Sequence, residues 1–222
     1  SVTMHDRLQR GRERSQPEAR FGYISGMPET AENVGRQYGI TREQADAFAV
    51  DSHRKAAAAW AEGRFADEVI ALEVPQAKGA PLVFQKDEGI RAETSMESLA
   101  KLRPVLKDGT VTAGNSSQQN DAAAACLVVA EDKLAELGLE PMAWLHSWAS
   151  SGCEPACMGI GPVPAVAKLF ARNGLGFEKL DLVELNEAFA MQALAVLKGW
   201  DWHDPSRLNV NGSGISLGHP IG

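Results

Sequence analysis

The sequence predicts a layered α/β protein, and two observations support this prediction. Short apolar runs typical of strands alternate along the chain with longer helical segments that end at glycine. Hydrophobic residues make up 44% of the 222 residues and charged residues 23%, which is ordinary for a globular protein and argues against a disordered chain. A chain of this length can form one large domain or two modest ones.

Composition also excludes several classes of protein. No apolar run approaches the ~18 residues that a transmembrane helix needs, and the opening Ser1-Val2-Thr3 begins no apolar signal segment. The net charge of −7 disfavours a nucleic-acid partner. Three cysteines are too few for a disulfide scaffold, so we expect a reducing, cytoplasmic location.

The first third of the chain predicts a loop and two helices. Residues 1–29 are polar and rich in Arg, Gly and Pro, which favours an extended loop. We expect a first helix capped by Thr30 and ended by Gly39. The capping-box pattern at Thr41–Gln44 opens the second helix, which should stop at Gly63.

A hairpin and a short helix are expected next. Residues 67–74 and 81–84 read as strands on either side of a turn at Lys78-Gly79. A second capping-box pattern, Thr94–Glu97, predicts a short helix before Pro104.

The small, apolar run at 118–130 predicts a buried helix or a passage from helix to strand. Cys126 lies in this run and is expected to pack in the core, as free cysteines usually do. Residues 131–137 should form a short helix ended by Gly138, and residues 142–149 should form a strand.

The last elements alternate again. Residues 162–173 predict a helix that stops at the following glycine. A strand at 181–185 should run directly into a helix at 187–198, which Gly199 would stop. Asn209-Val210 should end a further strand.

Three segments have the composition of a chemical site. The loop 209–222 presents His219 among four glycines, and histidine can serve as base and acid near neutral pH; an ordinary glycine-rich connector is the alternative. Its glycines are Gly212, Gly214, Gly218 and Gly222, which allow positive φ and close backbone approach.

Asn186 lies at the expected start of a helix, where its amide could hold a water or an oxyanion or could simply cap the helix. The polar run 110–125 could let a ligand approach its backbone or could be a plain loop.

Together these segments resemble the thiolase family. Asn186-Glu-Ala-Phe189, Gly218-His-Pro220 and Thr112-Ala-Gly-Asn115 stand in the family's order and at its separations. Further agreement comes from Thr30-Ala-Glu-Asn33, Lys101-Leu-Arg-Pro104 and Met158-Gly-Ile-Gly-Pro-Val-Pro164. The resemblance covers essentially the whole chain and implies part of the thiolase-like, layered αβαβα fold. It further implies a CoA-covering loop domain at 1–117, the end of the N-terminal half at 118–140 and the start of the C-terminal half at 141–222.

Within the family, the sequence motifs are most similar to those of β-ketoadipyl-CoA thiolases. Biosynthetic acetoacetyl-CoA thiolases tend to carry a His where Gly26 stands here. We therefore expect a degradative 3-ketoacyl-CoA thiolase, acting in fatty acid or aromatic degradation, rather than an acetoacetyl specialist.

The resemblance implies an activity and roles for particular residues. Thiolases cleave a 3-ketoacyl-CoA with CoA, or run the reverse Claisen condensation, through a cysteine acyl-enzyme. His219 would deprotonate that cysteine and bind the thioester oxygen, and Asn186 would position a water in an oxyanion hole. The residues expected to contact acyl-CoA are Ser117 and Ala113 at the pantetheine arm, Arg91 near the nucleotide, and Phe189, Met158 and Met27 around the acyl group. CoA would be a substrate, with no separate cofactor or metal, and the enzyme would be a homodimer or homotetramer.

Neither cysteine of the family's mechanism matches a position in this chain. We expect the nucleophilic cysteine upstream of Ser1 and the acid/base cysteine downstream of Gly222, so the chain should be an internal fragment that is inactive alone. Cys153 and Cys157 supply too few ligands for a metal site. Gln118 stands where the family usually has glycine, so its side chain should narrow the CoA groove.

Two alternatives to a thiolase enzyme are open. A β-ketoacyl synthase relative would have a similar fold, but such proteins lack the Asn-Glu-Ala-Phe block. A thiolase-like CoA- or lipid-binding protein without catalysis would lack the upstream nucleophilic cysteine.

Overall fold

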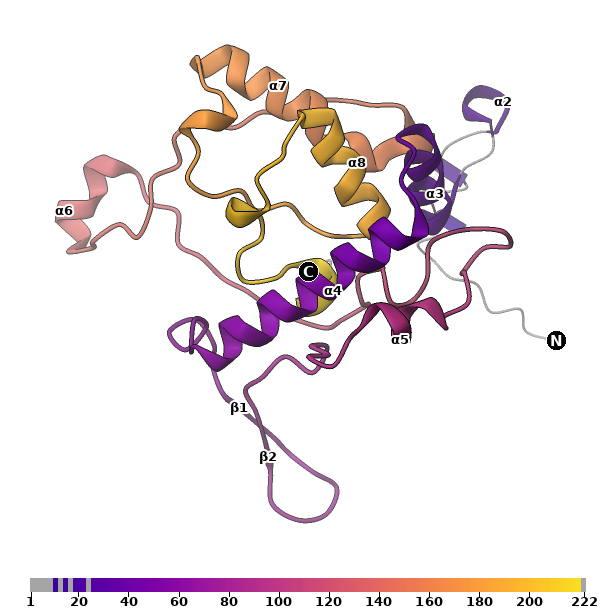
Figure 1. Cartoon of the computed structure of the whole chain (residues 1–222). Coiled ribbons are helices and arrows are strands. Elements are labelled where there is room, and N and C mark those ends of the chain that lie inside the picture. The colour runs from indigo at the N-terminus through magenta and orange to yellow at the C-terminus, as the bar shows by residue number, and fades with distance from the viewer. Residues whose placement is uncertain (1–9, 12–13, 16–17, 23–24, 221–222) are drawn as a thin grey trace.

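The computed structural model describes residues 10–11, 14–15, 18–22 and 25–220. Its elements are α2 (Glu18–Phe21), α3 (Met27–Gln37), α4 (Arg42–Ala61), β1 (Leu72–Val74), β2 (Leu82–Phe84), α5 (Met96–Ala100), η1 (Glu131–Lys133), α6 (Leu134–Leu137), η2 (Pro155–Ile160), α7 (Pro162–Asn173), η3 (Phe177–Lys179), α8 (Ala190–Trp200), η4 (Pro205–Arg207) and α9 (Gly214–Leu217). In Figure 1, α3, α4 and α8 gather in one body, while the β1–β2 hairpin and α6 extend away from it.

Helix α8 is the centre of the hydrophobic core. One cluster packs α8 against α3, α4, α5 and α9 and consists of Ala31, Val34, Ile40, Ala45, Ala49, Leu99, Val111, Ala190, Met191, Ala195 and Ile215. A second, smaller cluster of Leu185, Ala193, Val196 and Leu208 joins α8 to the segments that precede it and follow it. The small residues of α4 and α8 allow close approach of the helix backbones, which fixes the loops that leave these helices.

Helix α4 begins and ends as the sequence predicts. The Thr41 hydroxyl accepts a hydrogen bond from the Gln44 N–H at 3.2 Å, and the Gln44 side-chain carbonyl accepts one from the Thr41 N–H at 2.9 Å. Gly63 follows the helix with a φ of +72°. The capping box therefore forms as its spacing indicates.

Two other helix starts were predicted wrongly. Helix α3 begins at Met27 with Gly26 as its cap, and the Thr30 hydroxyl bonds to the Met27 carbonyl inside the helix. The cap of α5 is Ser95 rather than Thr94, because the Ser95 hydroxyl accepts the Ser98 N–H. The expected loop over residues 1–29 is interrupted by α2 and by the start of α3, while residues 1–9, 12–13, 16–17 and 23–24 lie outside the described residues.

The predicted hairpin and three helix ends can be compared directly with the structure. Strands β1 and β2 pair antiparallel, with Leu72 opposite Phe84. Gly138 and Gly174 end α6 and α7 in the left-handed conformation, as expected. Helix α8 passes through Gly199 and ends at Trp200, and the following residue, Asp201, adopts a φ of +54°.

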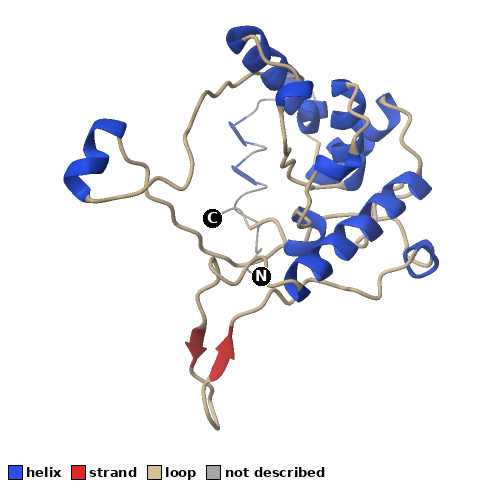
Figure 2. Ribbon diagram, turned by 60° about the vertical axis from the view of Figure 1, so that its left-hand side comes forward, coloured by secondary structure: helices blue, strands red, loops and turns tan. Residues whose placement is uncertain are grey.

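Two long stretches do not form the predicted buried elements. Residues 118–130 and 142–149 are extended chain without helix or strand, and Figure 2 shows them as long loops on either side of α6. Leu127 is 85% exposed, Met142 is fully exposed, and Cys126 is exposed rather than packed in a core. A strand forms only when a neighbouring strand satisfies its backbone groups, and none lies beside these stretches among the described residues.

The strand expected at 181–185 is reduced to a single contact. Val183 forms a parallel bridge with Leu208, in which the Val183 N–H donates to the Arg207 carbonyl at 2.8 Å and the Asn209 N–H to the Val183 carbonyl at 2.9 Å. The strand end expected at Asn209-Val210 likewise appears only as bridges. These bonds nevertheless align the two segments that carry Asn186 and His219.

Candidate active site

Asn186 and His219 meet although 33 residues separate them in the chain. The Asn186 side-chain nitrogen Nδ2 lies 3.2 Å from the His219 ring nitrogen Nε2. An amide NH2 group only donates hydrogen bonds, so Nε2 acts as the acceptor in this pair. Both side chains are exposed, which leaves them open to an incoming substrate. The two residues that the sequence singled out therefore form one unit.

The position of Asn186 differs from the one predicted. Helix α8 begins at Ala190, with Phe189 as its cap, so Asn186 neither caps the helix nor lies at its N-terminus. The backbone of 186–189 pairs with another segment instead, because the Ser117 N–H donates to the Ala188 carbonyl at 2.9 Å. This pairing delays the helix by one turn and frees the Asn186 amide to contact His219.

Glycines in the C-terminal loop have the conformational role that was predicted. Gly212 and Gly218 adopt φ values of +84° and +105°, which L side chains rarely tolerate. Gly214 has ordinary backbone angles, but a Cβ there would lie 2.8 Å from the Asn186 side-chain oxygen and 2.8 Å from the Glu187 carbonyl. The loop can therefore pack directly on the Asn186 segment. Gly222 lies outside the described residues.

The third segment of the sequence pattern, 112–120, lies between the other two. Ser116 forms an antiparallel bridge with Phe189, and the Ala190 N–H donates to the Asn115 carbonyl at 2.9 Å. At its other end, the Gln118 carbonyl accepts the His219 N–H at 3.3 Å. Backbone hydrogen bonds thus join all three segments that carry candidate site residues.

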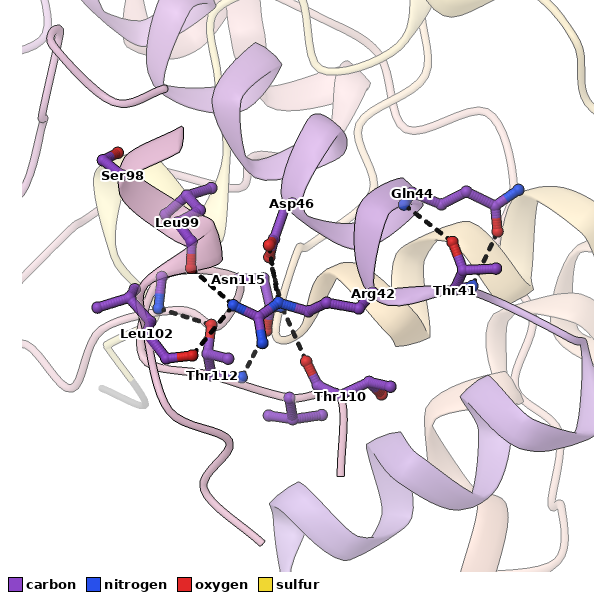
Figure 3. A network of polar contacts seen from close by, with 12 residues as sticks. Thr41, Arg42, Gln44, Asp46, Ser98, Leu99, Leu102, Thr110, Thr112 and Asn115 are labelled. Atoms are coloured by element: carbon purple, nitrogen blue, oxygen red, sulfur yellow. Dashed lines mark hydrogen bonds and ion pairs between the residues drawn. The ribbon is translucent and has the colours of Figure 1, made fainter. Parts of the chain in front are cut away.

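A polar network beneath this segment fixes its shape (Figure 3). The Asn115 side chain is fully buried; its oxygen accepts the Thr112 N–H at 2.8 Å and its nitrogen donates to the Asp46 carboxylate at 2.9 Å. Asp46 in turn pairs with Arg42 at 2.7 Å, and Arg42 donates to the Leu99 carbonyl at 2.6 Å. Helix α4 and α5 are thereby tied to the Thr-Ala-Gly-Asn turn.

A cleft of about 700 Å³ opens beside this turn. Residues of four separate segments line it, among them His53, Arg91, Ser98, Ala113, Gln118 and Ile215. Two of the predicted CoA contacts, Arg91 and Ala113, therefore lie on the same cleft. Gln118 also lines it and donates from its side chain to the Gly89 carbonyl at 2.9 Å.

His53 also lines this cleft, although it was not among the site residues predicted from the sequence. Its ring nitrogen Nδ1 accepts the Arg91 N–H at 3.2 Å. Burial, with the nearby Arg91 charge as a lesser cause, lowers the pKa of His53 below its ordinary value. The position of His53 on the buried face of α4, four residues from Ala49, is the pattern that could have indicated it.

The remaining predicted contacts lie outside the residues that line the cleft. Ser117 is next to Gln118 and bonds to Ala188 through its backbone. Phe189 is half-buried against the main core cluster. Met27, at the start of α3, is 40% exposed, and Met158, in η2, is 49% exposed. The Asn33 side chain donates to the Ala156 carbonyl at 3.0 Å, which holds α3 against η2.

None of the three cysteines has the surroundings of an activated nucleophile. Cys126 and Cys153 are exposed, and the Cys153 thiol points to the Met158 carbonyl at 3.6 Å. Burial, followed by the charges of Glu154 and Cys153, raises the pKa of the Cys157 thiol, which disfavours the thiolate. Among the residues that the structure describes, no group of three His, Cys, Asp or Glu side chains could hold a metal ion.

The chain belongs to the thiolase family. The thiolase N-terminal domain matches residues 17–132, and the thiolase C-terminal domain matches residues 139–222. The chain is 54% identical over 194 residues to an acetyl-CoA acetyltransferase of Chromobacterium violaceum, a match that covers 87% of this chain and 49% of that protein. It is 51% identical, with the same coverage, to a probable acetyl-CoA acyltransferase of Staphylococcus aureus.

A solved structure confirms the fold. The crystal structure of the Bacillus anthracis acetyl-CoA acetyltransferase superposes with a TM-score of 0.83 at 45% identity, covering 87% of this chain and 49% of that one. The predicted thiolase-like α/β fold is therefore confirmed for the part that is present. The chain spans about half the length of the relatives it matches. No helix in the described part of the chain is long and apolar enough to cross a membrane.

Proposed function

We propose that this chain is part of a thiolase that cleaves 3-ketoacyl-CoA with CoA to acetyl-CoA and a shortened acyl-CoA, or catalyses the reverse condensation. The observation that carries the proposal is the 3.2 Å contact between Asn186 and His219, which joins two distant loops next to a cleft. The acetyl-CoA acetyltransferase names of the relatives support an acyl transfer between CoA esters.

The proposed chemistry divides between the pair and a cysteine thiolate. His219 would take the proton of the cysteine, because the thiolate is the reactive nucleophile. The thiolate attacks the 3-keto carbonyl, the Cα–Cβ bond breaks, and the carbanion of the departing acetyl-CoA takes a proton from the acid/base cysteine. CoA gives its thiol proton back to that cysteine and attacks the acyl-enzyme thioester, and the released nucleophilic cysteine regains its proton from His219. Asn186 would hold a water that stabilises the negative charge on the substrate oxygen.

We propose that both reacting cysteines come from parts of the full-length protein outside this chain. The raised pKa of Cys157 and the exposure of Cys126 and Cys153 support this assignment. The 222-residue chain alone should therefore show no thiolysis. The proposed substrate is a degradative 3-ketoacyl-CoA, with CoA as co-substrate and no separate cofactor.

The proposed CoA site is the cleft beside the Thr-Ala-Gly-Asn turn. Arg91 would lie near the nucleotide phosphates, since a guanidinium pairs well with phosphate. Ala113 and Ser117 would contact the pantetheine arm. We place the acyl group against Phe189, Met158 and Met27.

The remaining organisation is proposed from the family. Residues 1–117 would cover CoA, residues 118–140 would close the N-terminal half, and residues 141–222 would begin the C-terminal half. The exposed apolar side chains of the extended stretches would pack against further thiolase polypeptide, and the enzyme would be a cytoplasmic homodimer or homotetramer.

A hybrid enzyme tests the proposal. In it, this chain replaces the stretch that it matches in the Chromobacterium violaceum acetyltransferase, so that the relative supplies the remaining segments. Thiolysis of 3-ketoacyl-CoA by the hybrid, and none by the 222-residue chain, is the expected result. A folded hybrid that binds CoA but releases no acetyl-CoA would contradict the proposal, because the relative supplies both cysteines and only the residues of this chain could then lack the activity.

A further inference from the structure

A buried carboxylate follows Asn186 directly in the chain. Glu187 is only 2% exposed and is among the largest fully buried side chains of the described chain. Ionised carboxylates are almost never buried unless they are paired or hydrogen-bonded, because losing water around the charge is costly. The proposed reaction gives Glu187 no direct role, since its side chain points into the protein rather than into the cleft.

Three hydrogen-bond donors from three different segments converge on this carboxylate. The Ser52 hydroxyl of α4 donates to Oε2 at 2.6 Å, and the Ile215 N–H of α9 reaches the same oxygen at 3.3 Å. The Asn209 side-chain nitrogen donates to Oε1 at 2.9 Å. The Ser216 hydroxyl lies 2.8 Å from the Ser52 hydroxyl and also contacts the Ser213 carbonyl at 3.2 Å.

Two of these donors, Asn209 and Ile215, lie on the loop that carries His219. Asn209 starts the loop, and Ile215 lies four residues before His219. Asn209 is itself locked, because its side chain accepts the Leu185 N–H at 2.7 Å and donates to the Leu185 carbonyl at 2.8 Å. Glu187 therefore connects the Asn186 segment with the His219 loop on one side and with α4 on the other.

We infer that Glu187 is a positioning residue, whose buried hydrogen bonds hold Asn186 and His219 at contact distance. The inference rests on the proposed thiolase function. Burial raises the pKa of Glu187, while the three donors and the nearby Lys55 charge oppose that shift. Glu184, an exposed carboxylate three residues before Glu187, has its pKa raised by burial and by the charge of Glu187.

An amide of the same shape cannot replace this carboxylate. If the Gln oxygen took the place of Oε2, its NH2 group would face the NH2 group of Asn209, which cannot flip without losing both bonds to Leu185. If the oxygen took the place of Oε1, the NH2 group would face the Ile215 N–H. Glu187→Gln thus preserves volume but sets a donor against a donor in either orientation.

The test is Glu187→Gln in the hybrid enzyme, with Glu184→Gln as a control that makes the same chemical change three residues away. We expect Glu187→Gln to lower kcat about 100-fold, because a displacement near 1 Å of a reacting group has an effect of that order. KM for the 3-ketoacyl-CoA should stay within about threefold, since the cleft is intact. Glu184→Gln should leave kcat within about twofold.

Two further measurements keep the test decisive. Ser52→Ala serves as the second variant if Glu187→Gln does not fold. It removes one donor and leaves Glu187 in place, so it should lower kcat about fivefold. A crystal structure of the Glu187→Gln hybrid gives the separation of Asn186 Nδ2 and His219 Nε2 whether or not the enzyme turns over; we expect it to exceed hydrogen-bond distance. An unchanged separation, or an unchanged kcat in either variant, would overturn the inference. An inactive wild-type hybrid with the separation lost in Glu187→Gln would instead contradict the proposed function.

Discussion

The site loops and the extended stretches around α6 differ in how their side chains are buried and how their backbone is hydrogen-bonded. In the site, Asn115, Glu187 and Asn209 are buried polar side chains, and each makes hydrogen bonds to backbone or to another buried group. In the stretches 121–130 and 142–149, apolar side chains such as Leu127 are exposed, and the backbone lacks a neighbouring strand among the described residues.

The difference shows what each kind of structure requires. The buried polar side chains of the site find their hydrogen-bond partners within this chain, although some of these partners, such as Ser52 and Glu187, lie far apart in sequence. An extended apolar segment is specified only by the strand or helix that covers it, and that partner can come from anywhere in a protein. The Asn186–His219 contact can therefore form in a chain whose stretches 121–130 and 142–149 have no neighbouring strand among the described residues.

His219→Ala should have the largest effect on the site side of this comparison. Loss of a general base typically lowers turnover by about 10³-fold, and the exposed position of His219 predicts an unchanged fold. The measurement is kcat and melting temperature in the hybrid enzyme. His203→Ala, which removes another exposed histidine, is the matched control and should leave kcat unchanged.

Asn115→Ala should have the next largest effect, on stability. The substitution leaves the Thr112 N–H and the Asp46 carboxylate without their partner in a fully buried position. We expect a loss of about 3 kcal/mol in the free energy of unfolding, measured by denaturant titration of the hybrid enzyme. Gln119→Ala, at an exposed neighbour, is the control; equal losses for both would mean that the polar network does not stabilise the turn.

His53 should make stability depend on pH. Its folded-state pKa is lowered by burial, so the folded protein binds fewer protons than the unfolded chain as pH falls through the ordinary histidine range. Stability should therefore be complete above pH ~6.5 and decline as the pH falls below that value. His53→Gln retains an acceptor for the Arg91 N–H, so the difference between wild-type and variant unfolding free energies should decline on acidification. A difference that does not change with pH would contradict this.

Leu127→Ser should have the smallest effect in the 222-residue chain. An exposed side chain away from special features changes stability by less than about 0.5 kcal/mol. In the hybrid enzyme the same substitution should cost about 2 kcal/mol, because the proposed remaining half would bury Leu127. Denaturant titration of both proteins gives the loss in unfolding free energy in each. Equal small losses in both would contradict the proposed packing of Leu127.

The same distinction explains which features could be predicted from the sequence. The Thr41–Gln44 capping box, the antiparallel hairpin and the helix ends at Gly138 and Gly174 depend on local backbone chemistry, and the structure confirms them. The burial of 118–130 and the strand at 142–149 depend on distant partners, and those predictions were wrong for the chain as described.

The site was partly predictable for a related reason. The glycine conformations at 212 and 218 follow from the residue type, and the order of three segments pointed to the Asn186–His219 pair. The start of α8 was misplaced because backbone pairing with Ser117 overrode the capping preference of Asn186. His53 and Glu187 were missed because a buried polar residue is recognised by partners that lie far away in sequence.

A double-mutant cycle between Asn186 and His219 tests the central claim most directly. The measured quantity is kcat of the hybrid enzyme with Asn186→Ala, His219→Ala and both substitutions. If the 3.2 Å pair acts as one unit, the double variant should be no more than about threefold slower than His219→Ala alone, because effects within a unit are not additive. Losses that multiply across the two positions would mean that Asn186 and His219 act independently and would contradict the account.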